Sequence, residues 1–123
     1  MRIITTFIGL LIGATSFTQD VWVQRDSIKG PTRANAASFV LGDDGFIVSG
    51  YDGFNKKRSA VSYDIDQDDW DNEVSLGGVS GDGLNRTSAV GFRIRSYGYV
   101  CLGEGDGFMF KDLWEYNKFT DTW

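Results

Sequence analysis

A stretch near the end of the chain decides the fold, because its pattern occurs twice. The stretch reads Lys111-Asp112-Leu113-Trp114-Glu115-Tyr116-Asn117-Lys118-Phe119-Thr120-Asp121-Thr122-Trp123, and residues 58–70 carry a matching pattern 53 positions earlier. Tyr116, Asp121 and Trp123 correspond to Tyr63, Asp68 and Trp70. The same offset aligns residues 33–70 with residues 86–123 without a gap, and eight of the 38 aligned pairs are identical. A repeat of this length predicts two copies of one structural unit.

Alternation with a period of two predicts strands in both copies. In the second copy Val90, Phe92 and Ile94 alternate with glycine and arginine, and Ala37, Phe39 and Leu41 alternate in the first. Residues 45–50 and 98–103 are nearly continuous apolar runs, which predict strands covered on both faces. Sixteen glycines with a single proline suit many tight turns. No part of the mature chain has the spacing of an amphipathic helix, so the sequence predicts an all-β protein.

The spacing of the repeated residues resembles the kelch repeat. The markers are arginine, glycine, tyrosine and tryptophan at a period near fifty: Trp22, Arg33, Gly50, Tyr63, Trp70, Arg86, Gly103, Tyr116 and Trp123. The resemblance covers residues 20 to 123 and implies two four-stranded antiparallel blades of a kelch-type β-propeller, repeat 1 at about 33–70 and repeat 2 at about 86–123. The family's Gly-Gly pair is Ser49-Gly50 and Leu102-Gly103 here.

The resemblance also implies roles for the markers and an incomplete ring. The glycines are expected to allow positive φ or close approach, the arginines to donate to loop carbonyls, and the aromatic residues to pack between neighbouring blades. Trp22 takes the position of the outermost strand of a preceding blade. Two blades are fewer than the 4–8 of a closed propeller, so we expect the remaining blades to come from a longer chain or from self-association.

The N-terminus predicts export. Arg2, a short apolar run from Ile3 to Ile12 and small residues at 13–16 have the order of a secretory signal peptide over residues 1–18, with residues 19–123 as the propeller segment. Cleavage is expected between Ser16 and Gln19. The alternative is a buried strand or short helix. The run is too short to span a bilayer, and no cysteine follows it to carry a lipid anchor. We therefore expect a periplasmic, cell-surface or extracellular protein without a membrane anchor.

Composition excludes several kinds of function. The net charge is −5, which argues against nucleic acid as a partner. The chain contains no histidine, which removes Ser-His-Asp and Cys-His catalysis and the usual zinc and copper sites. Asp64 to Asp69 resemble the opening of a calcium loop but lack its glycine and its bidentate glutamate, so a polar turn is favoured. Cys101, the only cysteine, is predicted to be a buried apolar residue. We predict no metal and no cofactor.

Candidate ligand-binding residues lie in the loops that follow the second strand of each repeat. These loops occupy equivalent positions but differ in sequence, and their candidate residues are Tyr51, Asp52, Phe54, Glu104 and Asp106. Acidic and aromatic side chains suit a carbohydrate or a basic peptide, although two variable turns without a ligand give the same pattern. We expect a binding module for protein or glycan, with no catalytic residue assigned. The alternative is part of a sugar-active enzyme resembling kelch-type sialic acid epimerases.

Overall fold

Seven strands account for nearly all the regular structure in the computed structural model, which describes residues 21–123. In chain order they are β1 (Ala37–Leu41), β2 (Asp44–Tyr51), β3 (Lys56–Asp64), β4 (Asp69–Glu73), β5 (Val90–Ile94), β6 (Tyr97–Cys101) and β7 (Leu113–Asn117). A single turn of 3-10 helix, Gly78–Ser80, lies in the glycine-rich loop between the repeats. In residues 21–123 no helix is long and apolar enough to cross a membrane. The all-β prediction is confirmed, whereas the predicted signal peptide falls outside the described residues.

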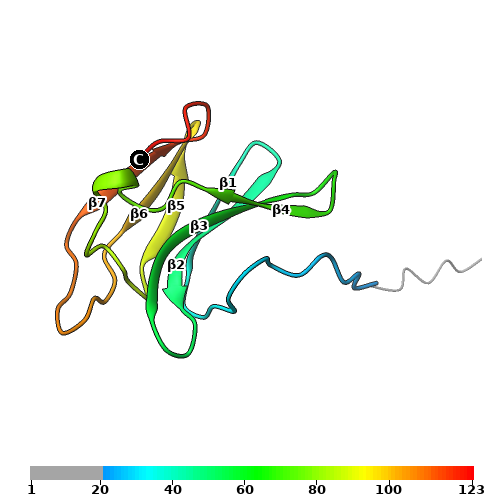
Figure 1. Cartoon of the computed structure of the whole chain (residues 1–123). Helices are drawn as coiled ribbons and strands as arrows, with labels where there is room; N and C mark the ends of the chain where they lie inside the picture. Colours follow the sequence, from blue (N-terminus) through cyan, green and yellow to red (C-terminus); the bar gives the residue numbers. More distant parts are fainter. Residues whose placement is uncertain (1–20) are drawn as a thin grey trace, which may run out of the picture.

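The strands form two antiparallel sheets in which each strand pairs with the next along the chain. The first sheet has the order β1-β2-β3-β4 and the second the order β5-β6-β7 (Figure 1). The second sheet therefore has three strands where four were expected. Its fourth strand is represented by one isolated bridge, between Asn117 and Thr122. That bridge corresponds to the first pair of the β3–β4 ladder, Asp64 with Asp69.

The backbone repeats with the offset seen in the sequence. Ala37 pairs with Val48 in the first sheet, and the equivalent Val90 pairs with Cys101 in the second. Residues with a positive φ recur at the same spacing, in the pairs Asn35 and Ser88, Ser49 and Leu102, Gly50 and Gly103, and Asp68 and Asp121. The two sheets are therefore two copies of one unit, in the same register.

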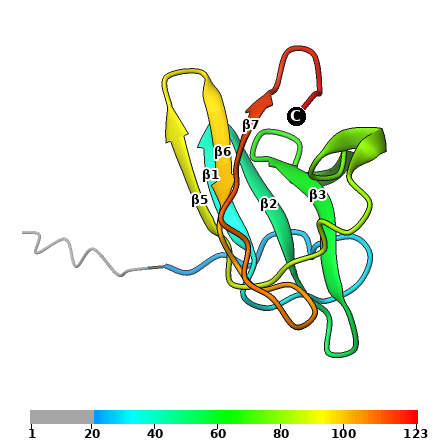
Figure 2. The ribbon, with the colours of Figure 1, turned by 90° about the vertical axis from the view of Figure 1, so that its left-hand side faces the viewer.

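The core lies where one face of the first sheet packs on the second sheet. Ala37, Phe39, Leu41, Phe46 and Val48 are each at most 6% exposed. The Tyr116 ring, 1% exposed, lies 5.5 Å from the Phe46 ring and 6.2 Å from the Phe39 ring. In Figure 2 the strands β5 and β6 of the second sheet lie in front of β1 of the first sheet.

The outer faces of the two sheets are more open than the inner faces within residues 21–123, although Val61, on the outer face of the first sheet, is only 2% exposed. Val90 and Ile94 on the second sheet are 49% and 52% exposed. Cys101 is likewise only half-buried, whereas its equivalent Val48 is fully buried. The difference arises because Val48 faces the second sheet and nothing in the described chain faces Cys101.

The two marker arginines hold the inner ends of the repeats. Arg33 Nη1 donates to the carbonyls of Ser49 and Ser59 at 3.3 and 3.1 Å. The equivalent Arg86 is fully buried, and its Nη1 donates to the carbonyl of Leu102 at 3.0 Å.

Arg86 also forms a bidentate ion pair with Asp112, with N–O distances of 2.6 and 2.7 Å, and its guanidinium lies 3.7 Å from the centre of the Phe110 ring. This pair lowers the pKa of Asp112 below its usual value. The predicted donation to loop carbonyls is thus seen for Arg86, whereas Arg33 donates to carbonyls within β2 and β3.

The marker glycines have the expected positive φ, and of the marker aromatic residues Tyr116 packs between the two sheets, whereas Tyr63 and Trp70 contact each other on the outer face. Gly50 and Gly103 have φ values of 106° and 97°. Tyr63 lies 5.1 Å from Trp70, and Tyr116 lies 5.0 Å from Trp123. Trp22 is 97% exposed and lies outside the strands.

Candidate functional site

The two variable loops lie at the same end of the molecule. The turn between β2 and β3 and the long connection between β6 and β7 both extend beyond the sheets on the side away from the C-terminus (Figure 1). Antiparallel pairing brings this about, because β2 and β6 run in equivalent directions in the two copies. The candidate residues that the sequence placed in equivalent loops are therefore neighbours in space.

Asp52 shapes the first loop. Its Oδ1 accepts the backbone N–H groups of Phe54 and Asn55 at 2.9 and 2.7 Å, and its Oδ2 lies 2.6 Å from Lys57 Nζ. The hydrogen bond from Lys57 and the two backbone donors hold the pKa of Asp52 well below its usual range. Asp52 remains a carboxylate at neutral pH and fixes the turn, leaving little capacity to bind a ligand directly.

Lys56 joins the two loops across the sheet interface. Its Nζ lies 3.1 Å from Glu104 Oε1 and 3.5 Å from Asp106 Oδ1, and it donates to the carbonyl of Gly105. The Lys56 side chain is only 15% exposed, whereas Asp106 is 88% exposed. Burial alone would lower the pKa of Lys56, but the hydrogen bond and charge of Glu104 and the charge of Asp106 raise it. Lys56 therefore stays charged and ties repeat 1 to the loop of repeat 2.

A polar hollow of about 420 Å³ lies between the loops. It is lined by Tyr51, Phe54, Asn55, Lys56, Lys57, Asn85 and Asp106. Three of the five sequence candidates, Tyr51, Phe54 and Asp106, line this hollow, and Asp52 and Glu104 fix its walls. The sequence reasoning missed the two lysines and Asn85, which come from the start of β3 and from the loop between the repeats. A basic pair directly after an acidic turn was the available signal for the lysines.

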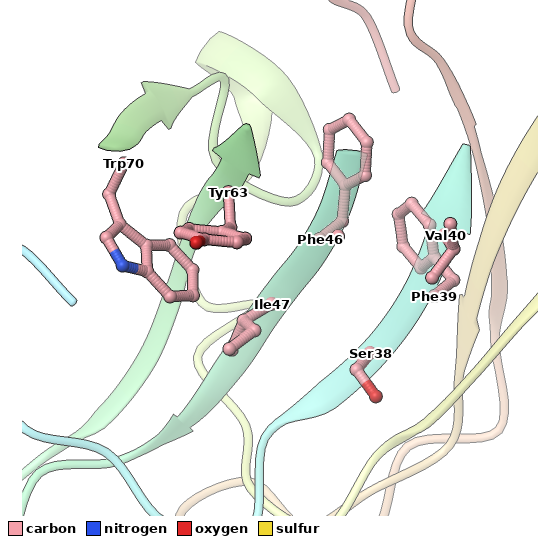
Figure 3. Close-up of a pocket in the computed structure, with 8 residues that line it drawn as sticks. Ser38, Phe39, Val40, Phe46, Ile47, Tyr63 and Trp70 are labelled. Carbon is pink, nitrogen blue, oxygen red and sulfur yellow. The ribbon is translucent and has the colours of Figure 1, made fainter. Parts of the chain in front are cut away.

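A second hollow lies on the outer face of the first sheet and is apolar. It measures about 240 Å³ and is lined by residues of all four strands: Ser38, Phe39, Val40, Gly45, Phe46, Ile47, Tyr63 and Trp70. Figure 3 shows the Tyr63 and Trp70 rings beside Ile47, with Ser38 and Val40 on the neighbouring β1 strand. The indole N–H of Trp70 is already used, since it donates to the carbonyl of Asp26 at 3.0 Å. This surface can make apolar contacts but has few free polar groups.

The acidic turn that resembles a calcium loop is held by its own hydrogen bonds. Asp64 Oδ1 accepts the backbone N–H groups of Asp66 and Gln67 at 2.8 and 3.1 Å. Asp68 Oδ1 accepts the Tyr63 hydroxyl at 2.6 Å. Across residues 21–123 no three histidine, cysteine, aspartate or glutamate side chains are grouped so that they could hold a metal ion. The polar turn favoured by the sequence is the observed structure.

Comparison with known proteins assigns no family to the chain. No protein-family model matches it. No curated protein matches it either.

Proposed function

We propose that each repeat is one blade of a kelch-type β-propeller, in an exported protein that binds a protein or glycan ligand through the loop hollow. The observation that carries this proposal is the meeting of loops from both repeats around one polar hollow. Loops on a rigid β scaffold are where binding residues concentrate. The repeat supports the blade assignment, because the two sheets share one register and one set of turn conformations.

The chemistry of the hollow favours a glycan over a charged peptide. The Lys56 ammonium is neutralised by Glu104 and Asp106, so the wall has no free strong positive charge there. The Asn55 and Asn85 amides offer donors and acceptors together, as neutral hydroxyl groups require. Phe54, 88% exposed, provides an apolar ring at the edge on which a sugar face can stack.

The arrangement favours binding over catalysis. Glu104 and Asp106 both lie within 3.5 Å of the same lysine, and Asp52 is saturated by donors. Acid–base chemistry on a sugar requires one group that acts as the acid and another that acts as the base, both facing the same substrate position. Glu104, Asp106 and Asp52 do not provide such a pair.

A glycan array with the purified chain tests the proposal. We expect selective binding that is reduced at least about tenfold by Phe54→Ala and by Asp106→Ala. Asp43→Asn, in the β1–β2 turn at the opposite end, is the matched control and should leave binding unchanged. If the array shows no selective binding and the chain instead retains members of a basic peptide library, the ligand is a peptide and not a glycan. Binding that is insensitive to both loop substitutions would refute the site.

A further inference from the structure

The contact between the two sheets can serve as a template for a second contact. It joins two different surfaces: the inner face of the first sheet, centred on the Phe39 and Phe46 rings, and the face of the second sheet that carries Gly98, Val100 and Tyr116. The Phe39 ring lies directly on Gly98, where a Cβ atom would come within 2.2 Å of it. Because the sheets are copies of one unit, the chain contains a second example of each surface.

Both second examples are largely open within residues 21–123, apart from the edge that the segment around Asp26 contacts. The counterpart of the first surface, here called the Phe92 face, consists of Val90, Phe92, Ile94, Tyr99 and Cys101. Its Phe92 and Tyr99 rings stack at 5.4 Å and 11°, as Phe39 and Phe46 do at 5.2 Å and 13°. The counterpart of the other surface, here called the Trp70 face, consists of Ser38, Val40, Gly45, Ile47, Tyr63 and Trp70 and contains the apolar hollow.

Gly45 indicates what the Trp70 face receives. A Cβ atom on Gly45 would have no heavy atom within 4 Å, and its φ is not positive, so neither space nor backbone conformation within the described chain calls for glycine. The equivalent Gly98 is needed because the Phe39 ring occupies the position of a side chain there. An aromatic ring arriving on Gly45 in the same way would explain the glycine, and the equivalent ring is Phe92.

The edge of the Trp70 face already has the geometry of the internal contact. Within the chain, Val74 donates its N–H to Asp121 at 3.1 Å and accepts from the Trp123 indole at 2.8 Å. On the Trp70 face, Asp26 makes the same two hydrogen bonds, to Asp68 at 3.0 Å and from Trp70 at 3.0 Å. The segment around Asp26 thus takes the place that the chain after β4 has in the internal contact.

Charge and polarity at the rim also agree. Within the chain, Lys118 forms an ion pair with Asp44 at 2.6 Å across the sheet contact. The residues at the equivalent positions of the open faces are Ile65 and Tyr97, which are 51% and 37% exposed. In the contact between copies, Ile65 and Tyr97 would therefore meet where Lys118 and Asp44 meet within the chain. This contact leaves no unpaired charge at that position.

We propose that a second copy of this chain docks head to tail, with its Phe92 face on the Trp70 face and its Phe92 ring on Gly45. The contact joins two different surfaces, so each bound copy again presents one free face of each kind. Such association continues until a ring closes, and 4–8 blades per propeller correspond to about two to four copies. The inference is independent of the ligand proposed for the loop hollow.

The two repeats differ at Gly91 and its equivalent Ser38, and this difference makes the contact between copies looser than the contact within the chain. Gly91 lies against the backbone of Ser38, and a Cβ atom there would come within 2.5 Å of the Ser38 oxygen. In the contact between copies the residue at this position is Ser38, which has a side chain. The strands must separate there by roughly 1 Å to restore an ordinary contact of about 3.5 Å. Ser38→Gly should therefore strengthen association.

Sedimentation velocity over a wide concentration range, with circular dichroism to check folding, tests this proposal. The wild-type chain should associate reversibly. Gly45→Val and Phe92→Ser should each weaken association by at least about tenfold, since one overpacks the contact and the other removes its ring. Val79→Ser, which changes an exposed apolar residue outside both faces, is the control and should have no effect.

Mixing the two weakened variants distinguishes head-to-tail docking from a symmetric contact. Gly45→Val keeps an intact Phe92 face, and Phe92→Ser keeps an intact Trp70 face. An equimolar mixture should therefore form a heterodimer that stops at two chains, although neither variant associates alone. A wild-type chain that stays monomeric at every concentration overturns the proposal. So does association that ignores both substitutions, or a mixture that stays monomeric.

Discussion

The matched pair Gly98→Ala and Gly45→Ala gives the sharpest test of the sheet packing. Gly45 and Gly98 are the second residues of β2 and β6, and they have equivalent pairing partners in the two sheets. Neither has a positive φ. At Gly98 the added methyl group would lie 2.2, 2.5 and 2.7 Å from three atoms of the Phe39 ring. That ring cannot move freely, because it is stacked on Phe46 and packed near Tyr116. At Gly45 the methyl group would meet nothing within 4 Å.

The expected magnitude follows from two opposing terms. Replacing glycine by alanine inside a strand stabilises it by about 0.5–1 kcal/mol, and this applies equally at both positions. Overpacking a core costs about 1–3 kcal/mol and applies only at Gly98. The difference in unfolding free energy between the two variants therefore isolates the overpacking cost, about 1–3 kcal/mol. At about 4–8 °C per kcal/mol for a unit of this size, their melting midpoints should differ by about 4 °C or more.

Urea denaturation followed by tryptophan fluorescence measures the difference. The protein should be dilute enough that its midpoint no longer depends on concentration, because Gly45 also lies in the proposed contact between copies. A difference in unfolding free energy of less than about 0.5 kcal/mol is what an ordinary surface change produces. A difference that small between the two variants would refute the close packing of Phe39 on Gly98.

Three further predictions concern buried polar groups. Asp112→Asn should destabilise the chain by about 2 kcal/mol or more in urea denaturation, since Arg86 is fully buried and loses its counter-charge. Ser59→Ala, the matched change in repeat 1, removes only a neutral acceptor and should cost about 1 kcal/mol. The Arg86 ion pair lowers the pKa of Asp112, so its stabilisation is fully present above the usual aspartate pKa of about 4 and is lost as the pH falls from there through the lowered pKa of the folded state. Unfolding midpoints from pH 7 to pH 3 should therefore fall more steeply for the wild type than for Asp112→Asn. Burial and the hydrogen bond to Asp121 raise the pKa of Tyr116, so Tyr116→Phe should remove the component that ionises at the highest pH in a spectrophotometric titration.

The strands could be predicted from the repeat, because register and turn conformation depend on local sequence and the same local pattern occurs in both copies. The offset between Tyr63 and Tyr116 in the sequence is the offset between the equivalent strands of the two sheets. What the sequence could not give was the burial of each face. Val48 and Cys101 are equivalent in pattern and differ in burial, because burial depends on which sheet lies opposite. Alternation identifies an apolar face and does not identify its partner.

The loop hollow was predictable only in part for a related reason. Loop position follows from the scaffold, so the two variable loops could be expected at the same end. The side chains that form the wall depend on contacts between repeats, such as Lys56 reaching Glu104, for which the sequence contains no periodic signal. Asp52 shows the converse: its acidic, exposed-looking position suggested a ligand contact, yet it caps the turn.

The same comparison separates the two kinds of surface on this molecule. On the sheet faces the repeats agree in shape, and their differences occur at the contact itself, as with Asp44 and Lys118 against Tyr97 and Ile65. This paired replacement fits the proposed contact between copies, because a change on one surface is matched by a change on the surface opposite. In the loops the replacements are unpaired: Asp52 and Phe54 correspond to Gly105 and Gly107, while the strands on either side keep their register. A position free to vary without a matching change in the fold is available for a ligand. These constraints are in keeping with the proposed association through the sheet faces and the proposed recognition through the loops.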